Sequence, residues 1–203
     1  MIDSRIAPEF AAVAQRFNIN LAGVLEALWQ PIYDTLAYPA AGATNLVAFQ
    51  NPVGVGGTTK ANTNVVAAGS FPAGQNFIAT DIQVEFLPGS LTTTAAYFTD
   101  QLAFYQSGWL EFNVGSKNYL TEAPTGKFPP KTRLQPFAVN DASAGPTVFR
   151  YAQNRGEIYQ ITPVLIPQNQ NFNVTLQWPA LVPVSAAANV RVTLGGYLYR
   201  TAQ

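Results

Sequence analysis

Residues 77–87, FIATDIQVEFL, alternate apolar and polar side chains with a period of two. Because successive side chains of a β-strand point to opposite faces, this pattern predicts a strand with one apolar and one polar face. The apolar face is expected to hold Ile78, Thr80, Ile82, Val84 and Phe86, and the polar face Asp81, Gln83 and Glu85.

Residues 171–178, NFNVTLQW, repeat the alternation, with Phe172, Val174, Leu176 and Trp178 on one face. Antiparallel sheets with one solvated face show such alternation, whereas buried parallel strands are continuously apolar. The two segments therefore predict a mostly β protein built as an antiparallel sandwich. A chain of 203 residues suits one domain with a sizeable core.

Charged residues make up only 11% of the chain, against about 25% in an average soluble domain. Because surface charge keeps soluble proteins apart, we expect copies of the same chain or other partners to cover much of the surface. The alternative is a neutral polar surface of Asn, Gln, Thr and Ser.

The chain contains no histidine and no cysteine. Their absence excludes Cys/His zinc sites, Ser-His and Cys-His nucleophiles, and the His-metal site of cupin enzymes. We therefore expect no enzyme, no cofactor and no small-molecule substrate. We also expect no signal peptide after Met1, because Asp3 and Glu9 lie close to it and no apolar segment follows.

The first forty residues predict a helical arm, followed by a sandwich domain over residues 41–203. Pro8 and Glu9 are typical of a helix start. A second helix is expected from Asn18 or Asn20 to about residue 36, with a kink or end at Pro31. The candidate contact residues of the arm are Phe10, Phe17, Leu21, Leu28 and Trp29. The arm either packs on the sandwich as part of its core or docks on a neighbour or a membrane surface.

After residue 44 the pattern predicts strands at 45–49, 62–68, 77–87, 109–114, 119–120, 147–152, 158–166, 171–178 and 189–200. A helix is expected over residues 92–106, and an irregular proline-rich loop over residues 122–136. Pro163 predicts an edge strand or a bulge, because proline cannot donate to a sheet. Gly195-Gly196 predicts a bulge in the last strand.

Residues 72–83 and 167–177 share a proline, a Gln-Asn-Phe triplet, and a following Thr and Gln. These units fit equivalent strands in the two Greek keys of a jelly roll, although shared turn residues explain them equally well. Four segments of the chain carry a resemblance to a known family: NFIATDIQVEFLPG, SGWLEFNVGSKNYLTEAPTGKFPPKTR, LIPQNQNFNVTLQWP and VRVTLGGYLYR. In these segments the chain resembles the jelly-roll capsid proteins of tailless icosahedral viruses, particularly bacteriophages.

The resemblance covers about three-quarters of the chain and implies a single jelly roll of eight to nine antiparallel strands with one short inserted helix. It implies a structural virion protein: the major capsid subunit, or alternatively a vertex or minor capsid protein. Its partners would be many copies of itself, other capsid proteins, and an internal membrane or the genome. It would be made in the host cytoplasm and reside in the virion.

Lys117, Lys127, Lys131 and Arg133 form the basic cluster of the sequence. They are candidates for contacts with phosphates or with acids of an adjacent subunit, and the alternative is a solvated loop. Residues 1–116 carry three bases against eight acids, a net charge of −5, and the remainder eight bases against three acids, a net charge of +5. This asymmetry fits either subunit steering or neutralisation within one sandwich.

A carbohydrate-binding or adhesion sandwich is the competing hypothesis from another functional class. Exposed Tyr197, Tyr199, Trp109 and Tyr119 would provide its stacking platform. Asp81 and Glu85 lie about 13 Å apart along a strand, too far for the carboxylate pair of a glycosidase.

Overall fold

The computed structural model describes residues 8–89, 94–131, 133–139, 148–154 and 157–201. These residues form two α-helices, α1 (Pro8–Arg16) and α2 (Thr94–Ser107), and two 3-10 helices, η1 (Leu21–Gly23) and η2 (Thr125–Lys127). The strands are β1 (Val24–Trp29), β2 (Ile32–Tyr38), β3 (Asn45–Ala48), β4 (Gln75–Leu87), β5 (Trp109–Val114), β6 (Lys117–Glu122), β7 (Arg133–Val139), β8 (Val148–Asn154), β9 (Tyr159–Ile166), β10 (Phe172–Gln177) and β11 (Ala188–Thr201).

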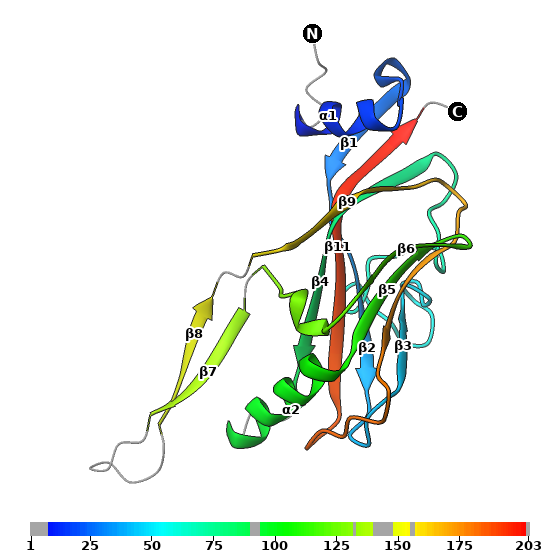
Figure 1. The fold of residues 1–203 in the computed structure, drawn as a ribbon. Coiled ribbons are helices and arrows are strands. Elements are labelled where there is room, and N and C mark those ends of the chain that lie inside the picture. Colours follow the sequence, from blue (N-terminus) through cyan, green and yellow to red (C-terminus); the bar gives the residue numbers. More distant parts are fainter. Residues whose placement is uncertain (1–7, 90–93, 132, 140–147, 155–156, 202–203) are drawn as a thin grey trace.

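The strands form two antiparallel sheets that face each other, and this confirms the predicted β-sandwich (Figure 1). The first sheet has the order β1-β11-β4-β9, and β2 pairs with β11 on the same side as β1. β2 pairs with the first half of β11 and β1 with its last residues. The second sheet has the order β3-β10-β5-β6. β7 and β8 form a separate hairpin.

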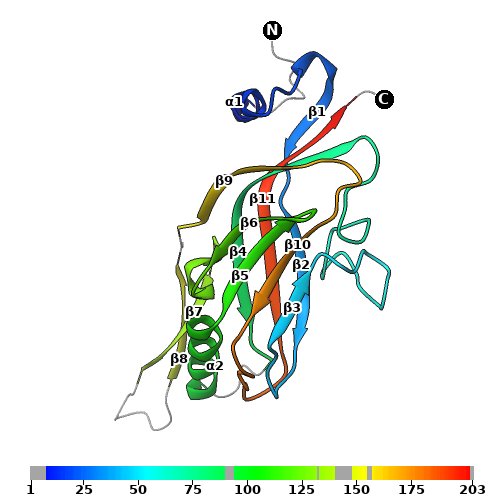
Figure 2. The same cartoon turned by 45° about the vertical axis from the view of Figure 1, so that its right-hand side comes forward.

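Successive strands pass back and forth between the sheets. β2, β3, β4 and β5 alternate between the two sheets, β5 and β6 form a hairpin, and β9, β10 and β11 alternate again. α2 interrupts the connection from β4 to β5, and the β7–β8 hairpin interrupts the connection from β6 to β9. Figure 2 shows the hairpin beside α2 at the edge of the body.

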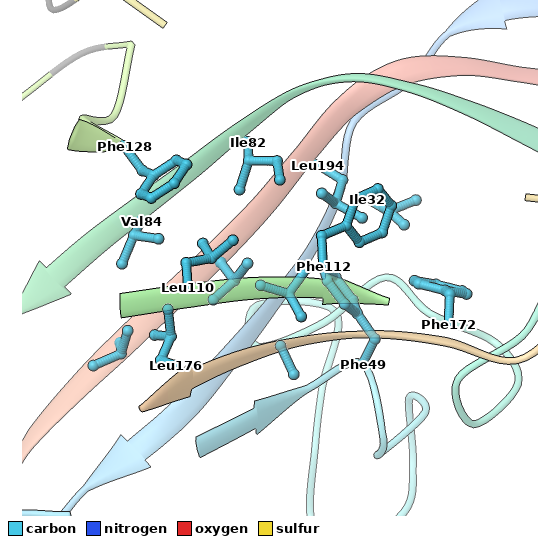
Figure 3. Close-up of a cluster of buried hydrophobic side chains, with 14 of the residues drawn as sticks. Ile32, Phe49, Ile82, Val84, Leu110, Phe112, Phe128, Phe172, Leu176 and Leu194 are labelled. Carbon is cyan, nitrogen blue, oxygen red and sulfur yellow. The ribbon is translucent and has the colours of Figure 1, made fainter. Parts of the chain in front are cut away.

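The apolar core lies between the sheets and is rich in phenylalanine (Figure 3). The ring of Phe71, in the connection from β3 to β4, stacks between Phe77 of β4 and Phe172 of β10, with centroids 5.4 Å and 5.2 Å away. The similar sequence units 72–83 and 167–177 are in contact, because the Gln168 N–H donates to Asn76 Oδ1 at 3.0 Å. The two similar sequence units therefore meet across the sandwich.

α2 confirms the predicted inserted helix and closes one end of the core. Phe104 is fully buried among the rings of Tyr38, Phe86 and Trp178. The Tyr105 hydroxyl accepts a hydrogen bond from the Phe86 N–H and donates one to the carbonyl of Val84. Packing and polar contacts thus fix the helix to β4.

β4 carries a bulge that reverses its alternation. Its register against β11 passes from Ala79 directly to Asp81, so Thr80 is the extra residue. Phe77 and Ala79 face the main core as Ile82 does, whereas Ile78 packs under α1 on the opposite face. The prediction that Ile78 shares a face with Ile82 is therefore wrong. The irregularity expected at Gly195-Gly196 occurs there, with the extra residue on the partner strand.

The second helix predicted for the arm is wrong, because residues 24–29 form β1 and residues 32–38 form β2, and both strands belong to the first sheet. Pro31 lies between these strands. A bulge between Val24 and Glu26 places Val24 and Ala27 on one face. Bulged strands can thus reproduce the i, i+3 spacing of a helix. Within the described residues, the arm is an α-helix only over Pro8–Arg16.

Two other local expectations are also wrong. Residues 62–68 make only isolated bridges, because side chains such as Asn62 and Asn64 bond the backbone N–H groups of Thr59 and Tyr33. The expected loop at 122–136 contains η2 and the start of β7. Pro163 does lie in an edge strand, β9, whose pairing with β4 lapses between Val164 and Gln160.

Candidate functional site

The four candidate basic residues do not form one cluster. Lys117 and Glu122 occupy opposite ends of β6, a separation of roughly 17 Å along the strand. Lys127 pairs with Glu122 and so lies at the far end from Lys117. Lys131 is exposed, and its backbone N–H donates to Gln83 Oε1 at 2.9 Å. Arg133 begins β7, and its side chain lies outside the described part of the structure.

Two of these lysines have partners within the chain. The Lys127 ammonium donates to Glu122 Oε1 at 2.6 Å, and this contact is the main reason that the pKa of Glu122 is lowered. Lys117 lies 4.6 Å from the centroid of the Tyr119 ring, which is a cation–π contact. The site predicted from charge is thus divided into separate contacts.

The predicted arm residues separate into a buried and an exposed set. Phe10 is fully buried against Tyr197 and Tyr199 of β11, and Phe17 and Leu21 pack on the same cluster. α1 therefore covers one face of the first sheet, here called the α1 face. Leu28 and Trp29 belong to β1 and are exposed.

β1 presents an apolar edge to solvent. It ends the first sheet in the described chain, and the exposed fractions of Leu25, Leu28 and Trp29 are 53%, 41% and 52%. The strand contains neither lysine nor proline, and its charged residue Glu26 pairs with Arg200 at 3.4 Å. An apolar edge strand without lysine or proline is a template for pairing with another chain.

The aromatic platform expected for a sugar-binding protein does not form. Tyr197 and Tyr199 are buried beneath α1, and burial raises the pKa of both hydroxyl groups. Trp109 lies on β5 in the other sheet, and Tyr119 on β6. The four rings thus do not share an exposed surface.

A cavity of about 570 Å³ opens on the α1 face, and we call it the outer cavity. Its walls come from α1, β1, β4, β9 and β11. The polar lining includes Asp81, Thr80, Gln160 and Arg16, and Trp29 and Tyr197 form an aromatic part of the wall. The two rings meet edge to face, with centroids 5.2 Å apart.

Asp81 is the unusual member of this lining, because its exposed fraction is only 4%. Its carboxylate accepts hydrogen bonds from the Gln83 amide at 3.1 Å and from the Thr80 hydroxyl at 3.3 Å. The sequence pattern placed Asp81 correctly on the polar face of the strand but wrongly in solvent. The sequence signal for this site is the glycine pair at 195 and 196, because glycine in a strand marks a place where another group comes close to the backbone.

A second cavity of about 470 Å³, the edge cavity, lies where β6 and β9 border the open side of the sandwich. Lys117, Tyr119, Leu120 and Tyr159 contribute to its lining. Residues 160–163 of β9 line both cavities, one on each side of the strand.

No family model matches the chain, and no curated protein is detectably similar to it. Among the described residues, no helix has the length and apolar character needed to cross a membrane.

Proposed function

We propose that the chain is a jelly-roll shell subunit that assembles with copies of itself, and that it is the major capsid protein of a tailless icosahedral virus, particularly a bacteriophage. One support comes from the architecture. The order β2-β11-β4-β9 facing β3-β10-β5-β6 is the arrangement expected when eight strands form two Greek keys. Such folds occur in capsid proteins, lectins and cupins.

The observation that carries the proposal is the apolar outer edge of β1, which no other strand of the described residues covers. A lectin that works as a small oligomer does not need three exposed apolar side chains on a strand whose outer edge pairs with no other strand of the described residues. In a shell the same edge is covered by a neighbouring subunit, which removes apolar surface from water. The low charge of the chain supports the same conclusion, since interfaces are depleted in charged residues.

The test is assembly of the purified protein, observed by electron microscopy and sedimentation velocity over a range of protein concentration. We expect closed particles or defined intermediates of assembly. Leu28→Lys should suppress assembly, because a lysine on an edge strand opposes pairing. Leu181→Lys is the matched control, because Leu181 is also exposed, at 59%, but lies in the connection between β10 and β11.

A protein that stays monomeric at high concentration would contradict the proposal. So would equal loss of assembly in both lysine variants, because the effect would then follow from added charge and not from β1. Binding of glycans by small oligomers would favour the carbohydrate-binding hypothesis instead.

A further inference from the structure

We infer that the outer cavity is a binding site for a positively charged group, an ammonium or a guanidinium. The inference goes beyond the proposed function and does not depend on it. It rests on the buried carboxylate of Asp81, on the local structure that places this carboxylate in the cavity, and on the aromatic wall beside it.

The negative charge of Asp81 is not balanced by a cation in the described structure. Its hydrogen-bond partners, Thr80 and Gln83, are neutral. Arg16 also lines the cavity, but no ion pair joins it to Asp81 among the described residues. Burial of a carboxylate without an opposite charge is costly. A cation that enters the cavity would remove this cost.

A β-bulge and a glycine in the neighbouring strand hold Asp81 in this position. The bulge at Thr80 gives the strand an extra residue, and Asp81 then faces Gly195 of β11. A Cβ atom at position 195 would lie much closer to the two carboxylate oxygens of Asp81 than van der Waals contact allows. Bulges and strand glycines mark sites where a side chain is redirected or a close approach is needed. Here both occur at the same point.

The aromatic wall adds a second attraction for a cation. Trp29 and Tyr197 line the cavity together with Asp81. The negative faces of aromatic rings attract ammonium and guanidinium groups, and tryptophan does so most strongly. A ligand that combines a cation with an aliphatic stem would contact Asp81 with its charge and Trp29 or Val13 with its stem.

The cation can come from a free small molecule or from a lysine or arginine of a second copy. The surplus of five positive charges in residues 117–203 makes the chain itself a source of such side chains. Both sources share one chemistry at the cavity, and they differ in whether self-association depends on Asp81.

The direct test titrates the protein with Nα-acetyl-lysine methylamide and with methylguanidinium, and follows the indole N–H signals by NMR. The Trp29 signal should shift, because its ring lines the cavity. Trp178 and Trp109 provide internal references, since their indole N–H groups bond the Phe104 carbonyl and Glu111 within the protein. A neutral sugar, methyl glucoside, serves as the comparison ligand.

Asp81→Asn keeps the shape of the side chain and removes its charge, so it should weaken binding of both probes by about tenfold or more. Trp29→Leu should weaken binding by about two- to fivefold. Glu26→Gln is the matched control: it removes one negative charge from β1, where Glu26 pairs with Arg200, and affinity should stay within about twofold because exposed charges are screened.

Sedimentation velocity of the native protein and Asp81→Asn identifies the source. If the probes bind and Asp81→Asn weakens self-association, the occupant is a side chain of a second copy. If the probes bind and association is unchanged, the occupant is a free cation.

The inference is overturned if neither probe shifts Trp29, if methyl glucoside binds while the cations do not, or if Glu26→Gln weakens binding as much as Asp81→Asn. It is also overturned if the probes bind only to Arg16→Gln, because Arg16 would then be the native occupant. Particle formation in the assembly experiment is a separate measurement, so failure of this inference is distinguishable from failure of the proposed function.

Discussion

The carboxylate of Asp81 lies against the backbone of Gly195, its register partner across the β4–β11 pair. Both residues sit in the middle of long strands, where a glycine ordinarily weakens a sheet. The two residues fit together because the Asp81 carboxylate occupies the space beside the Gly195 Cα, and glycine has no side chain to fill that space.

Gly195→Ala should therefore destabilise the protein by about 1–3 kcal/mol, because the added methyl group overlaps the carboxylate. The free energy of unfolding from urea denaturation measures the effect. Gly23→Ala is the control, since a Cβ at position 23 meets no atom within 4 Å, and it should change stability by less than about 0.5 kcal/mol.

The double variant Asp81→Ala with Gly195→Ala identifies the cause. If the overlap is responsible, the two substitutions couple by about 1 kcal/mol or more, and the second relieves part of the effect of the first. Additive effects would show that Gly195 is required for some other reason.

Strand alternation predicted the β-sandwich well, because a period of two survives wherever a strand is regular. β5 and β10 agree with their predicted spans almost residue for residue. The pattern failed at the bulges of β1 and β4, where one extra residue reverses the faces. Bulges depend on the partner strand, which a single sequence segment does not contain.

The outer cavity could not be predicted for a related reason. Its residues come from five elements that are distant in the sequence, and the buried Asp81 lies in a cavity that α1, β1, β9 and β11 line together with β4. Local sequence showed a polar strand face there. The enclosure is a property of the tertiary structure.

Phe104 is expected to contribute more to stability than any exposed residue of α2. Phe104→Ala leaves a large cavity among Tyr38, Phe86 and Trp178 and should cost about 3–5 kcal/mol. Leu102→Ala, on the same helix but 56% exposed, should cost less than about 0.5 kcal/mol. Urea denaturation compares the two. Similar losses would mean that α2 does not pack as described.

Asp34 should make stability depend on pH. Burial raises the pKa of its carboxyl group above the ordinary value of 3.8, although hydrogen bonds from the backbone of Phe49 and Thr35 and from Thr63 oppose the shift. The folded state thus binds the proton more tightly than the unfolded state. The corresponding stabilisation is fully present below the unfolded pKa and is lost as the pH rises through the folded pKa.

Asp34→Asn keeps an oxygen acceptor for the Phe49 N–H, which donates to Asp34 at 2.6 Å, and removes the titration. The free energy of unfolding of the native protein minus that of the variant should therefore decrease as the pH rises above about 3.8. A difference that stays constant or increases over that range would contradict the shift.

Lys127→Met should raise the pKa of Glu122 toward its ordinary value, because the Lys127 hydrogen bond is the largest cause of the lowered pKa. NMR titration of the Glu122 carboxyl carbon measures this. Lys117→Met serves as the control, because Lys117 lies over Tyr119 at the other end of β6. An equal change in both variants would indicate a general charge effect. The ion pair is exposed, so the pKa change should diminish as salt is added.

The segment between β6 and β9 begins and ends at neighbouring points of the sandwich. The Tyr159 hydroxyl donates to Glu122 Oε2 at 3.3 Å, and the rings of Tyr159 and Phe128 have centroids 4.5 Å apart. Replacing residues 133–156 by a short Gly-Ser linker should thus leave the sandwich folded, with its far-ultraviolet circular dichroism and cooperative unfolding retained. Loss of cooperative unfolding would show that the hairpin is part of the core.

Because the contacts of Tyr159 with Glu122 and Phe128 close the base of this segment, we expect the sandwich and the segment to accept sequence changes at different rates. A substitution in the sandwich must fit the side chains of both sheets. The segment beyond Phe128 and Tyr159 does not carry this constraint, so we expect it to tolerate changes of length and sequence. Diversity among descendants of this chain should accumulate there first, on a scaffold that stays the same.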